Sequence, residues 1–347
     1  MLETLLDGQA EWLSGDGPDA DSAILSQCRL TRNLKEFPFP GQCDDTEQAA
    51  VERRVVDVLD ALNLMENGAY FSLGDLDDRE AKFLFERLLI PYRLWKGSGP
   101  RGAYIANDQS IGIAINGEDH IEIRAHTSGV QIEEVWSRVN AIDDQLANNI
   151  DFAFNDRLGY LTTSVRNVGT GLRASALLHL PGLVMTGELV KVADEFRDKR
   201  FALNPAVGPH GEELADLFRL INPSTLGRPE SEIVLRIKMA AADLIGRERS
   251  ARARIRTELP LQLEDRVGRA LGVAREARLL EFSEAVSVLS SLRMGVSEGL
   301  LDEFATHAVN EVFIASHDAQ IELKHNQSCD ELTLNSDRAD LFRARFA

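Results

Sequence analysis

Short stretches of alternating apolar and polar residues predict β-strands along the first two thirds of the chain. One strand is expected at residues 24–30 and another near residues 218–222. Three more are joined by short turns, which is typical of the centre of an antiparallel sheet; they cover residues 103–106, 111–116 and 120–124. The first part of the chain is therefore expected to hold a central sheet.

Apolar residues at the spacing of a helical turn predict helices around and after these strands. One helix opens at Thr46 and ends near Asn67 and Gly68; its core-facing residues are Val51, Val55, Val58, Leu59 and Leu62. Two further helices are expected at residues 77–90 and 132–150. From Ser231 on, the pattern is almost entirely helical, with breaks at Pro260, Gly272, Gly295 and Gly299.

These elements predict an α+β fold, in which an antiparallel sheet flanked by helices is followed by an α-helical C-terminal domain. We expect the first domain at residues 1–229 and the second at residues 230–347. The length of 347 residues suits two domains of ordinary size.

The charge balance changes the expected partners. The net charge of -18 argues against binding to nucleic acid or to an anionic membrane surface, so a phosphate site must be a local basic island. No apolar run reaches the length of a membrane span, and the acidic N-terminus lacks a signal-peptide pattern, which predicts a cytoplasmic protein. Three scattered cysteines fit neither a disulfide framework nor a zinc site, and no metal site is expected.

The stretch Asn167-Val168-Gly169-Thr170-Gly171-Leu172-Arg173-Ala174-Ser175 carries the first sign of chemistry. Alternate glycines can turn backbone N–H groups toward an anion, and an arginine just beyond can add a bidentate phosphate contact. The residues alone also fit a tight turn before a helix. Phosphate binding and a structural turn therefore both remain open at this point.

The same stretch, followed by His179-Leu180-Pro181, resembles the signature of the phosphagen kinases (ATP:guanidino phosphotransferases), in particular the bacterial protein arginine kinases. The resemblance covers nearly the whole chain, including Glu11–Asp19, Arg32–Lys35 with Phe37–Pro40, and Ile115–His120. It implies the phosphagen kinase catalytic fold, which is glutamine synthetase-like. It also implies ATP with Mg²⁺ as phosphoryl donor and a protein arginine as acceptor. His179 is expected to be a structural histidine in a buried helix.

The resemblance assigns roles to individual residues. Glu118 matches the catalytic carboxylate, which must align a delocalised guanidinium and accept its proton. Arg29 and Arg173 match arginines that bind nucleotide phosphates, and the nucleotide-binding stretch includes Asn167, Gly169, Thr170 and Gly171. Arg166 is an additional cation beside this stretch and is expected to contact the nucleotide as well.

Several positions depart from the family pattern. Arginines are replaced at Gln27, which shares a strand face with Arg29, and also at Glu122 and Asn204. A second catalytic glutamate is replaced by Pro209, a cysteine by Ser164, and another glutamate by Gly117. Ser164 cannot carry the negative charge of a thiolate near neutral pH. Arg124, Arg166 and Glu212 are residues that could take over missing roles.

The helical region carries two further features. In the bacterial protein arginine kinases it supports dimerisation and holds a phosphoarginine-sensing motif, of which Arg338 and Ala339 are kept here. A homodimer and a link to Clp protease machinery are therefore expected from the resemblance. A run of arginines predicts either a solvated helix face or a docking site for an acidic partner; it contains Arg247, Arg249, Arg252, Arg254 and Arg256.

Two hypotheses about function follow. Phosphoryl transfer depends on positioning and electrostatics, so the joint loss of cations, a carboxylate and a thiol favours a pseudokinase or strongly impaired kinase with a regulatory or scaffold role. The alternative is a divergent active kinase, because Glu118, Arg29 and Arg173 survive.

Overall fold

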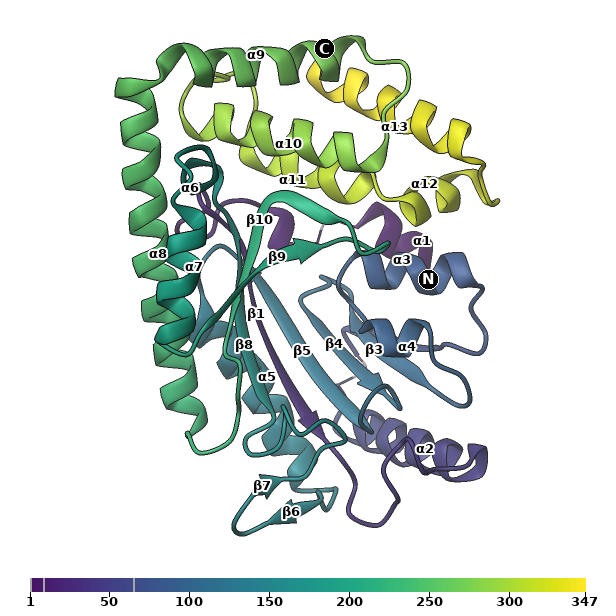
Figure 1. Cartoon of the computed structure of the whole chain (residues 1–347). Helices are drawn as coiled ribbons and strands as arrows, with labels where there is room; N and C mark the ends of the chain where they lie inside the picture. The colour runs from purple at the N-terminus through teal and green to yellow at the C-terminus, as the bar shows by residue number, and fades with distance from the viewer. Residues whose placement is uncertain (1, 9, 65) are drawn as a thin grey trace.

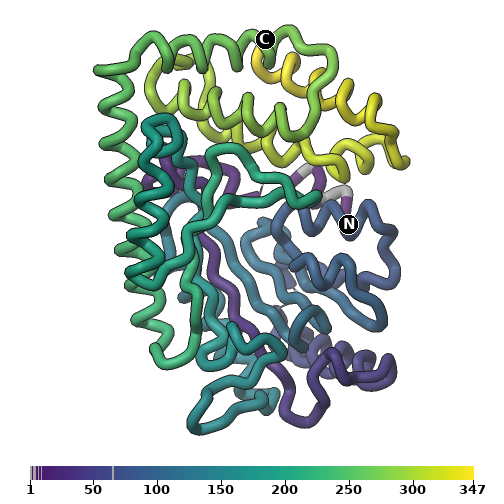
Figure 2. Tube along the Cα trace, in the orientation of Figure 1, coloured from purple at the N-terminus to yellow at the C-terminus, as the bar shows by residue number. Residues whose placement is uncertain are grey.

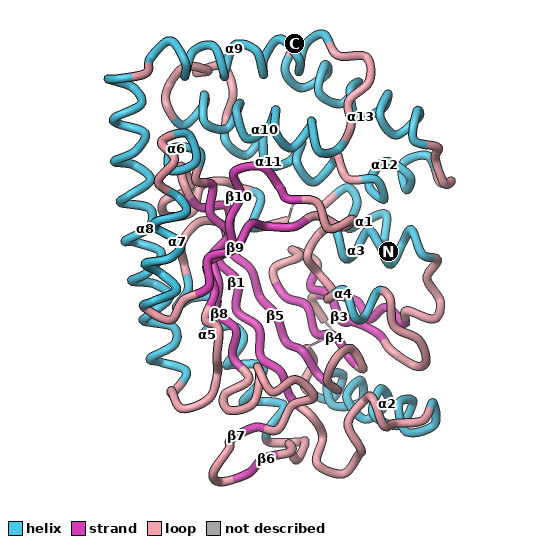
Figure 3. Tube along the Cα trace, viewed as in Figure 1, coloured by secondary structure: helices cyan, strands magenta, loops and turns pink. Residues whose placement is uncertain are grey.

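The computed structural model describes residues 2–8, 10–64 and 66–347, and at its centre lies one eight-stranded antiparallel sheet (Figures 1 and 3). The strand order is β2-β3-β4-β5-β1-β8-β10-β9. The strands are β1 (Ala23–Arg32), β2 (Gly68–Ser72), β3 (Gly102–Ala106), β4 (Ile111–Ile115), β5 (Ile121–Ser128), β8 (Leu172–His179), β9 (Ala202–Val207) and β10 (Glu213–Ile221). A small hairpin pairs β6 (Phe154–Asn155) with β7 (Gly159–Tyr160).

Helices surround the sheet and then form a separate layer across one of its ends (Figures 1 and 2). Beside the sheet lie α1 (Leu2–Asp7), α2 (Asp45–Ala61), α3 (Asp78–Glu86), α4 (Tyr92–Trp95), α5 (Ile132–Ala147), α6 (Pro181–Met185), α7 (Leu189–Asp198) and α8 (Glu230–Glu258). The layer contains α9 (Pro260–Glu276), α10 (Phe282–Ser297), α11 (Thr306–Ala315), α12 (Asp318–His325) and α13 (Glu331–Phe346). The α+β fold is confirmed. No helix among the described residues is long and apolar enough to cross a membrane.

The sheet has one apolar face and one polar face. On β1, Cys28 and Leu30 belong to the main hydrophobic core, which α5 and α8 complete. Gln27 and Arg29 alternate with them and point to the opposite face. Long helix α8 contributes to this first core, whereas the core of the C-terminal layer begins at Ile255. The predicted boundary between residues 229 and 230 stays a prediction.

Two predicted helix breaks are wrong. Gly272 lies inside α9 and Gly295 lies inside α10. A glycine within a helix costs only about 1 kcal/mol relative to alanine, so packing can override it. At Gly295 a Cβ atom would lie 2.6 Å from a methyl group of Val267, which shows why a side chain is absent there.

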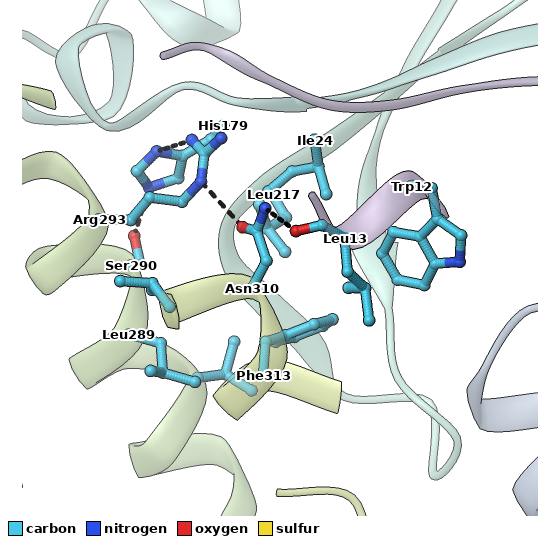
Figure 4. Close-up of a pocket in the computed structure, with 12 residues that line it drawn as sticks. Trp12, Leu13, Ile24, His179, Leu217, Leu289, Ser290, Arg293, Asn310 and Phe313 are labelled. Carbon is cyan, nitrogen blue, oxygen red and sulfur yellow. Dashed lines mark hydrogen bonds between the residues drawn. The ribbon is translucent and has the colours of Figure 1, made fainter. Parts of the chain in front are cut away.

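The helical layer is joined to the sheet by a buried polar network (Figure 4). His179, expected in a helix, instead ends strand β8; it is structural, because it is fully buried. Arg293 Nη1 donates to His179 Nδ1 at 3.1 Å, and Arg293 Nε donates to Asn310 Oδ1. Burial, and then the charges of Arg293 and Arg252, hold the pKa of His179 well below its usual value. The neutral ring therefore bonds the two layers together.

The arginines of the run on α8 form ion pairs with acidic residues of the same chain. Arg252 is buried against Glu248, and Arg249 pairs with Asp19 and Asp21. The other members pair as Arg247 with Glu195 and Asp243, Arg254 with Glu188, and Arg256 with Glu298. The run thus fastens α8 to its surroundings, and each of its guanidinium groups already has a partner.

Glu86 should make the stability of this contact depend on pH. It is buried where α12 packs on α3, and burial raises the pKa of its carboxyl group to about 8. The folded state therefore holds a proton that the unfolded chain releases near pH 4.5, so stability is lost as pH rises toward 8. Glu86→Gln should raise the Tm by a few degrees at about pH 8.5 and much less at about pH 5.

Differential scanning calorimetry of Glu86→Gln at both pH values tests this expectation. The exposed Glu258→Gln variant is the control, because the same chemical change there should leave the Tm unaltered at either pH. An equal effect of Glu86→Gln at the two pH values would contradict the account.

Candidate active site

A row of arginines crosses the polar face of the sheet. Arg29 on β1 lies opposite Arg124 on β5 and opposite Arg173 on β8. Ser175 shares a face with Arg173, two residues before it, and pairs with Ile221 on β10. Arg219 is two residues from Ile221 and therefore points to the same face. Arg29, Arg124 and Arg219 line a cavity of about 520 Å³ that also reaches the segment 204–209. We call these four residues the arginine row.

Glu122 is neutralised within the row. Its carboxylate bonds to Arg124 and lies 3.5 Å from Arg29 Nη1. Burial alone would raise the pKa of Glu122, but the charges of Arg124 and Arg29 outweigh it and hold the pKa below its usual value. The negative charge that replaces a family arginine therefore orients two other arginines.

Gln27, where the resemblance leads us to expect an arginine, accepts a hydrogen bond from the guanidinium group of Arg219. Arg219 Nη1 donates to Gln27 Oε1 at 3.2 Å and to Ser175 Oγ at 3.3 Å. Gln27 Nε2 donates in turn to His126 Nε2 at 2.7 Å. Because β8 lies between β10 and β1, the side chain of Arg219 reaches across a strand to place its charge beside Gln27. Asn204, where the resemblance also leads us to expect an arginine, lies opposite Arg219 in the pairing of β9 with β10.

The row is short of negative charge. Arg173 and Arg219 form no ion pair with any described residue. Burial, followed by repulsion from Arg29 and Arg124, lowers the pKa of Arg219 to about 10. Burial, followed by repulsion from Arg29 and Arg166, lowers the pKa of Arg173 to about 10. Both remain charged at neutral pH, so the arginine row carries more positive than negative charge.

The glycine stretch positions Arg173. Arg173 Nε donates to Asn167 Oδ1 at 3.1 Å, and its Nη1 donates to the carbonyl of Asn222. The amide of Gly169 donates to Tyr160 O, and that of Thr170 donates to Thr225 O. These two N–H groups are thus used inside the protein. Gly169 has φ +115°, and a Cβ atom there would lie 2.5 Å from Thr225 O, so close backbone packing requires the glycine.

Of the two interpretations, the turn is found, but it leads into strand β8 and not into a helix. The turn is real, and through Arg173 it supplies one cation of the row, whereas direct nucleotide contacts from Asn167, Gly169, Thr170 and Gly171 stay a prediction. Arg166 is exposed and near enough to lower the pKa of Arg173.

Glu118 stands at the tip of the turn between β4 and β5, and its side chain is exposed. Its charge acts to raise the pKa of Arg173, so the predicted catalytic carboxylate lies within electrostatic reach of that guanidinium. Asp119 holds the turn: its Oδ1 accepts from Asn33 Nδ2 and from the amide of Thr163, both at 2.6 Å. This bond ties the Glu118 turn to the segment that contains Ser164.

The loop between β9 and β10 does not supply a second carboxylate to act together with Glu118. Glu212 Oε2 accepts from the amide of His210 at 2.9 Å, so this side chain folds onto its own loop. His210 Nε2 lies 2.9 Å from Asp318 Oδ2, which fastens the loop to the C-terminal layer. In this arrangement Glu212 does not take over the role lost at Pro209.

Arg338, predicted to sense phosphoarginine, is buried and occupied. Its guanidinium donates to Ser316 O, Leu280 O, Asn335 Oδ1 and Asp318 Oδ1 at 2.7 to 2.9 Å. Binding of an anion at Arg338 would have to displace Asp318, which also holds His210. The sensing role stays a prediction.

Arg219 is the site residue that sequence reasoning missed. Alternation in residues 218–222 does place it on the face opposite Phe218 and Leu220, which are buried. Alternation shows to which face Arg219 points but not which residues lie beside it. The nearness of β10 to β1 depends on the order of the strands in the sheet, which alternation does not reveal.

Comparison with known proteins agrees with this geometry. Residues 50–251 match the family model "ATP:guanido phosphotransferase, C-terminal catalytic domain", and residues 260–347 match "Protein-arginine kinase McsB C-terminal domain". A protein-arginine kinase of Symbiobacterium thermophilum is 33% identical over 98% of this chain and 97% of its own length. One from Moorella thermoacetica is 33% identical over 99% of both chains.

Solved structures show the same fold. Lombricine kinase superimposes with a TM-score of 0.59 and 23% identity, over 71% of this chain and 73% of its own. The substrate-free duplicated taurocyamine kinase from Schistosoma mansoni gives a TM-score of 0.58 and 19% identity, over 86% of this chain and 43% of its own. The family models and the full-length relatives together settle the family: this chain belongs to the protein-arginine kinases, within the ATP:guanido phosphotransferases.

Proposed function

We propose that the protein binds Mg-ATP on the arginine row and that its transfer of phosphate to protein arginine is strongly impaired, so that it acts as a regulatory or scaffold protein. The observation that supports the proposal is that four arginines share one face of the sheet, whereas the carboxylate of Glu212 does not join them. Arg219 stands beside Gln27 and Asn204, whereas Glu212 is turned away into its own loop.

The arginine row suits the phosphates of ATP. Guanidinium groups bind phosphate oxygens in a bidentate manner, and half-buried ones do so with little competition from solvent. The lining of the same cavity also includes Trp12, Leu177 and Phe313, which suit an apolar base. Because the row offers guanidinium groups and not metal ligands, Mg²⁺ would be held through the ATP phosphates.

The catalytic part of the site is weaker. Glu118 would orient the acceptor guanidinium alone, and Ser164 cannot add the charge of a thiolate. If each missing contact costs about 2 to 4 kcal/mol of transition-state stabilisation, the two losses together remove most of the rate. By resemblance, the proposal extends to a homodimer, to protein partners that include Clp protease machinery, and to the cytoplasm.

A divergent active kinase is the second candidate, and one observation favours it. Glu122 is paired with Arg124 and Arg29, as a rearranged working site requires, whereas an abandoned site would have no need of such pairing. Arg219 and Arg124 would then replace the lost cations.

An assay of phosphoarginine separates the two candidates. Incubation with Mg-ATP and an arginine-rich protein should give no acid-labile phosphoarginine above that of the Glu118→Gln variant, because a lone carboxylate orients the acceptor poorly. Robust incorporation by the wild type that disappears in Glu118→Gln would establish the active kinase instead.

A further inference from the structure

A second basic surface lies beside the edge of the sheet, outside the arginine row. A cavity of about 610 Å³ opens between the end of α7, edge strand β9 and the start of α8. Its lining contains no aspartate or glutamate among the described residues but does contain four arginines: Arg197, Arg200, Arg228 and Arg236. In a chain with a net charge of -18, such a cluster is a local exception.

Arg200 is the most available of these cations. It follows α7 in the left-handed conformation, with φ 61°, at a position that glycine occupies at least cost. Its side chain is exposed, and its guanidinium forms no hydrogen bond or ion pair with any described residue. An arginine is thus retained where the backbone favours glycine, with its charge unused inside the chain.

The other three arginines have partners within the chain, but these contacts leave them able to bind a ligand. Arg236 Nη2 donates to Lys199 O at 2.9 Å, and its guanidinium lies 5.0 Å from the ring centre of Phe201. Arg197 pairs with Asp194 on α7, and Arg228, just before α8, pairs with Glu232; all four side chains are at least partly exposed. Such pairs contribute little energy and exchange readily for another carboxylate. The cavity therefore keeps a positive excess.

The cavity continues toward the candidate active site on two sides. A second cavity of about 260 Å³ shares Leu226, Gly227 and Arg228 with it and extends to Gly169 and Thr170. Exposed Phe154 and Leu158 border that second cavity. On the other side, Asn204 lines both the 610 Å³ cavity and the 520 Å³ cavity of the arginine row. The described lining of the second cavity adds Arg157 and one acidic residue, Glu230. We call the two adjoining cavities the basic groove.

The shape of the basic groove indicates the kind of ligand. Two adjoining hollows are longer than one small anion needs, and the mixture of arginines with exposed Leu226, Phe154 and Leu158 suits a polypeptide with acidic and apolar side chains. Because the chain as a whole carries a net charge of -18, charge would steer such a segment to a basic surface such as this groove.

We propose that the basic groove binds an extended acidic segment of a partner protein. That this partner is a protein regulated or scaffolded by the chain rests on the proposed function, whereas binding of an acidic peptide does not. Partner choice would then depend on glutamate and aspartate residues in that segment.

Fluorescence anisotropy with a labelled peptide tests the proposal; the peptide carries one arginine between runs of glutamate. Arg200→Glu should weaken its binding by about tenfold or more at low salt and by less at high salt, because exposed charges are screened. Arg269→Glu is the matched control: it reverses an exposed arginine on α9 and should leave the affinity unchanged. Equal weakening by both variants would show general attraction by charge and would overturn the proposal.

Two further arms complete the experiment. Unlabelled pyrophosphate should displace the peptide only at concentrations well above those of the competing unlabelled peptide; displacement at lower concentrations would identify a small-anion site and overturn the proposal. Arg219→Gln should leave peptide binding intact. A wild type that binds the peptide, loses it in Arg200→Glu and yet fails to bind Mg-ATP would contradict the proposed function while supporting the basic groove.

Discussion

Glu122→Arg should destabilise the protein by about 3 to 5 kcal/mol, because it replaces a mostly buried carboxylate paired with two arginines by a fifth guanidinium on the same face. Arg29 and Arg124 would lose the group that orients them and would repel the new side chain. Unfolding by urea should therefore show a much lower midpoint with an unchanged slope.

The same substitution should weaken the binding of Mg-ATP, although it restores the residue of the family. The carboxylate of Glu122 belongs to the arrangement that sets the position of Arg29, so its loss disturbs the row that we propose for phosphate binding. Glu134→Arg on the exposed side of α5 is the matched control and should change stability by less than about 1 kcal/mol. Tighter nucleotide binding with an unchanged unfolding midpoint would show that Glu122 merely repels phosphate.

The sequence predicts the face of the sheet to which a side chain points better than it predicts which strands lie side by side. Alternation correctly places Gln27 with Arg29 and Glu122 with Arg124, because a period of two residues is a local property. The contact of Arg219 with Gln27 joins residues far apart in the chain, and it depends on the strand order. Local patterns carry no information about that order.

The same limit explains the errors. His179 lies in an apolar stretch before a proline, a pattern that fits the end of a buried strand as well as a helix. Gly295 was expected to end a helix, but its closeness to Val267 decides its role, and that contact is tertiary. For the glycine stretch, the residues alone could not show whether the N–H groups face a ligand or, as at Gly169 and Thr170, protein carbonyls.

Arg219→Gln should lower the affinity for Mg-ATP by about 10- to 100-fold, or about 1.4 to 2.7 kcal/mol. Arg219 is the cation that stands beside both Gln27 and Asn204, and no described carboxylate competes for it. The side chain is half-buried, so its charge acts on a ligand with little screening. Glutamine keeps a polar donor toward Gln27 and Ser175, which limits the structural consequence of the change.

Isothermal titration calorimetry of Mg-ATP with the wild type, Arg219→Gln and the exposed control Arg269→Gln tests the central claim most directly, because it measures phosphate binding without requiring phosphotransfer. We expect binding by the wild type, an equal affinity in Arg269→Gln, and the stated loss in Arg219→Gln with an unchanged Tm of the free protein. Equal affinities in all three proteins, or the absence of binding by a folded wild type, would contradict the assignment of the arginine row as the nucleotide site.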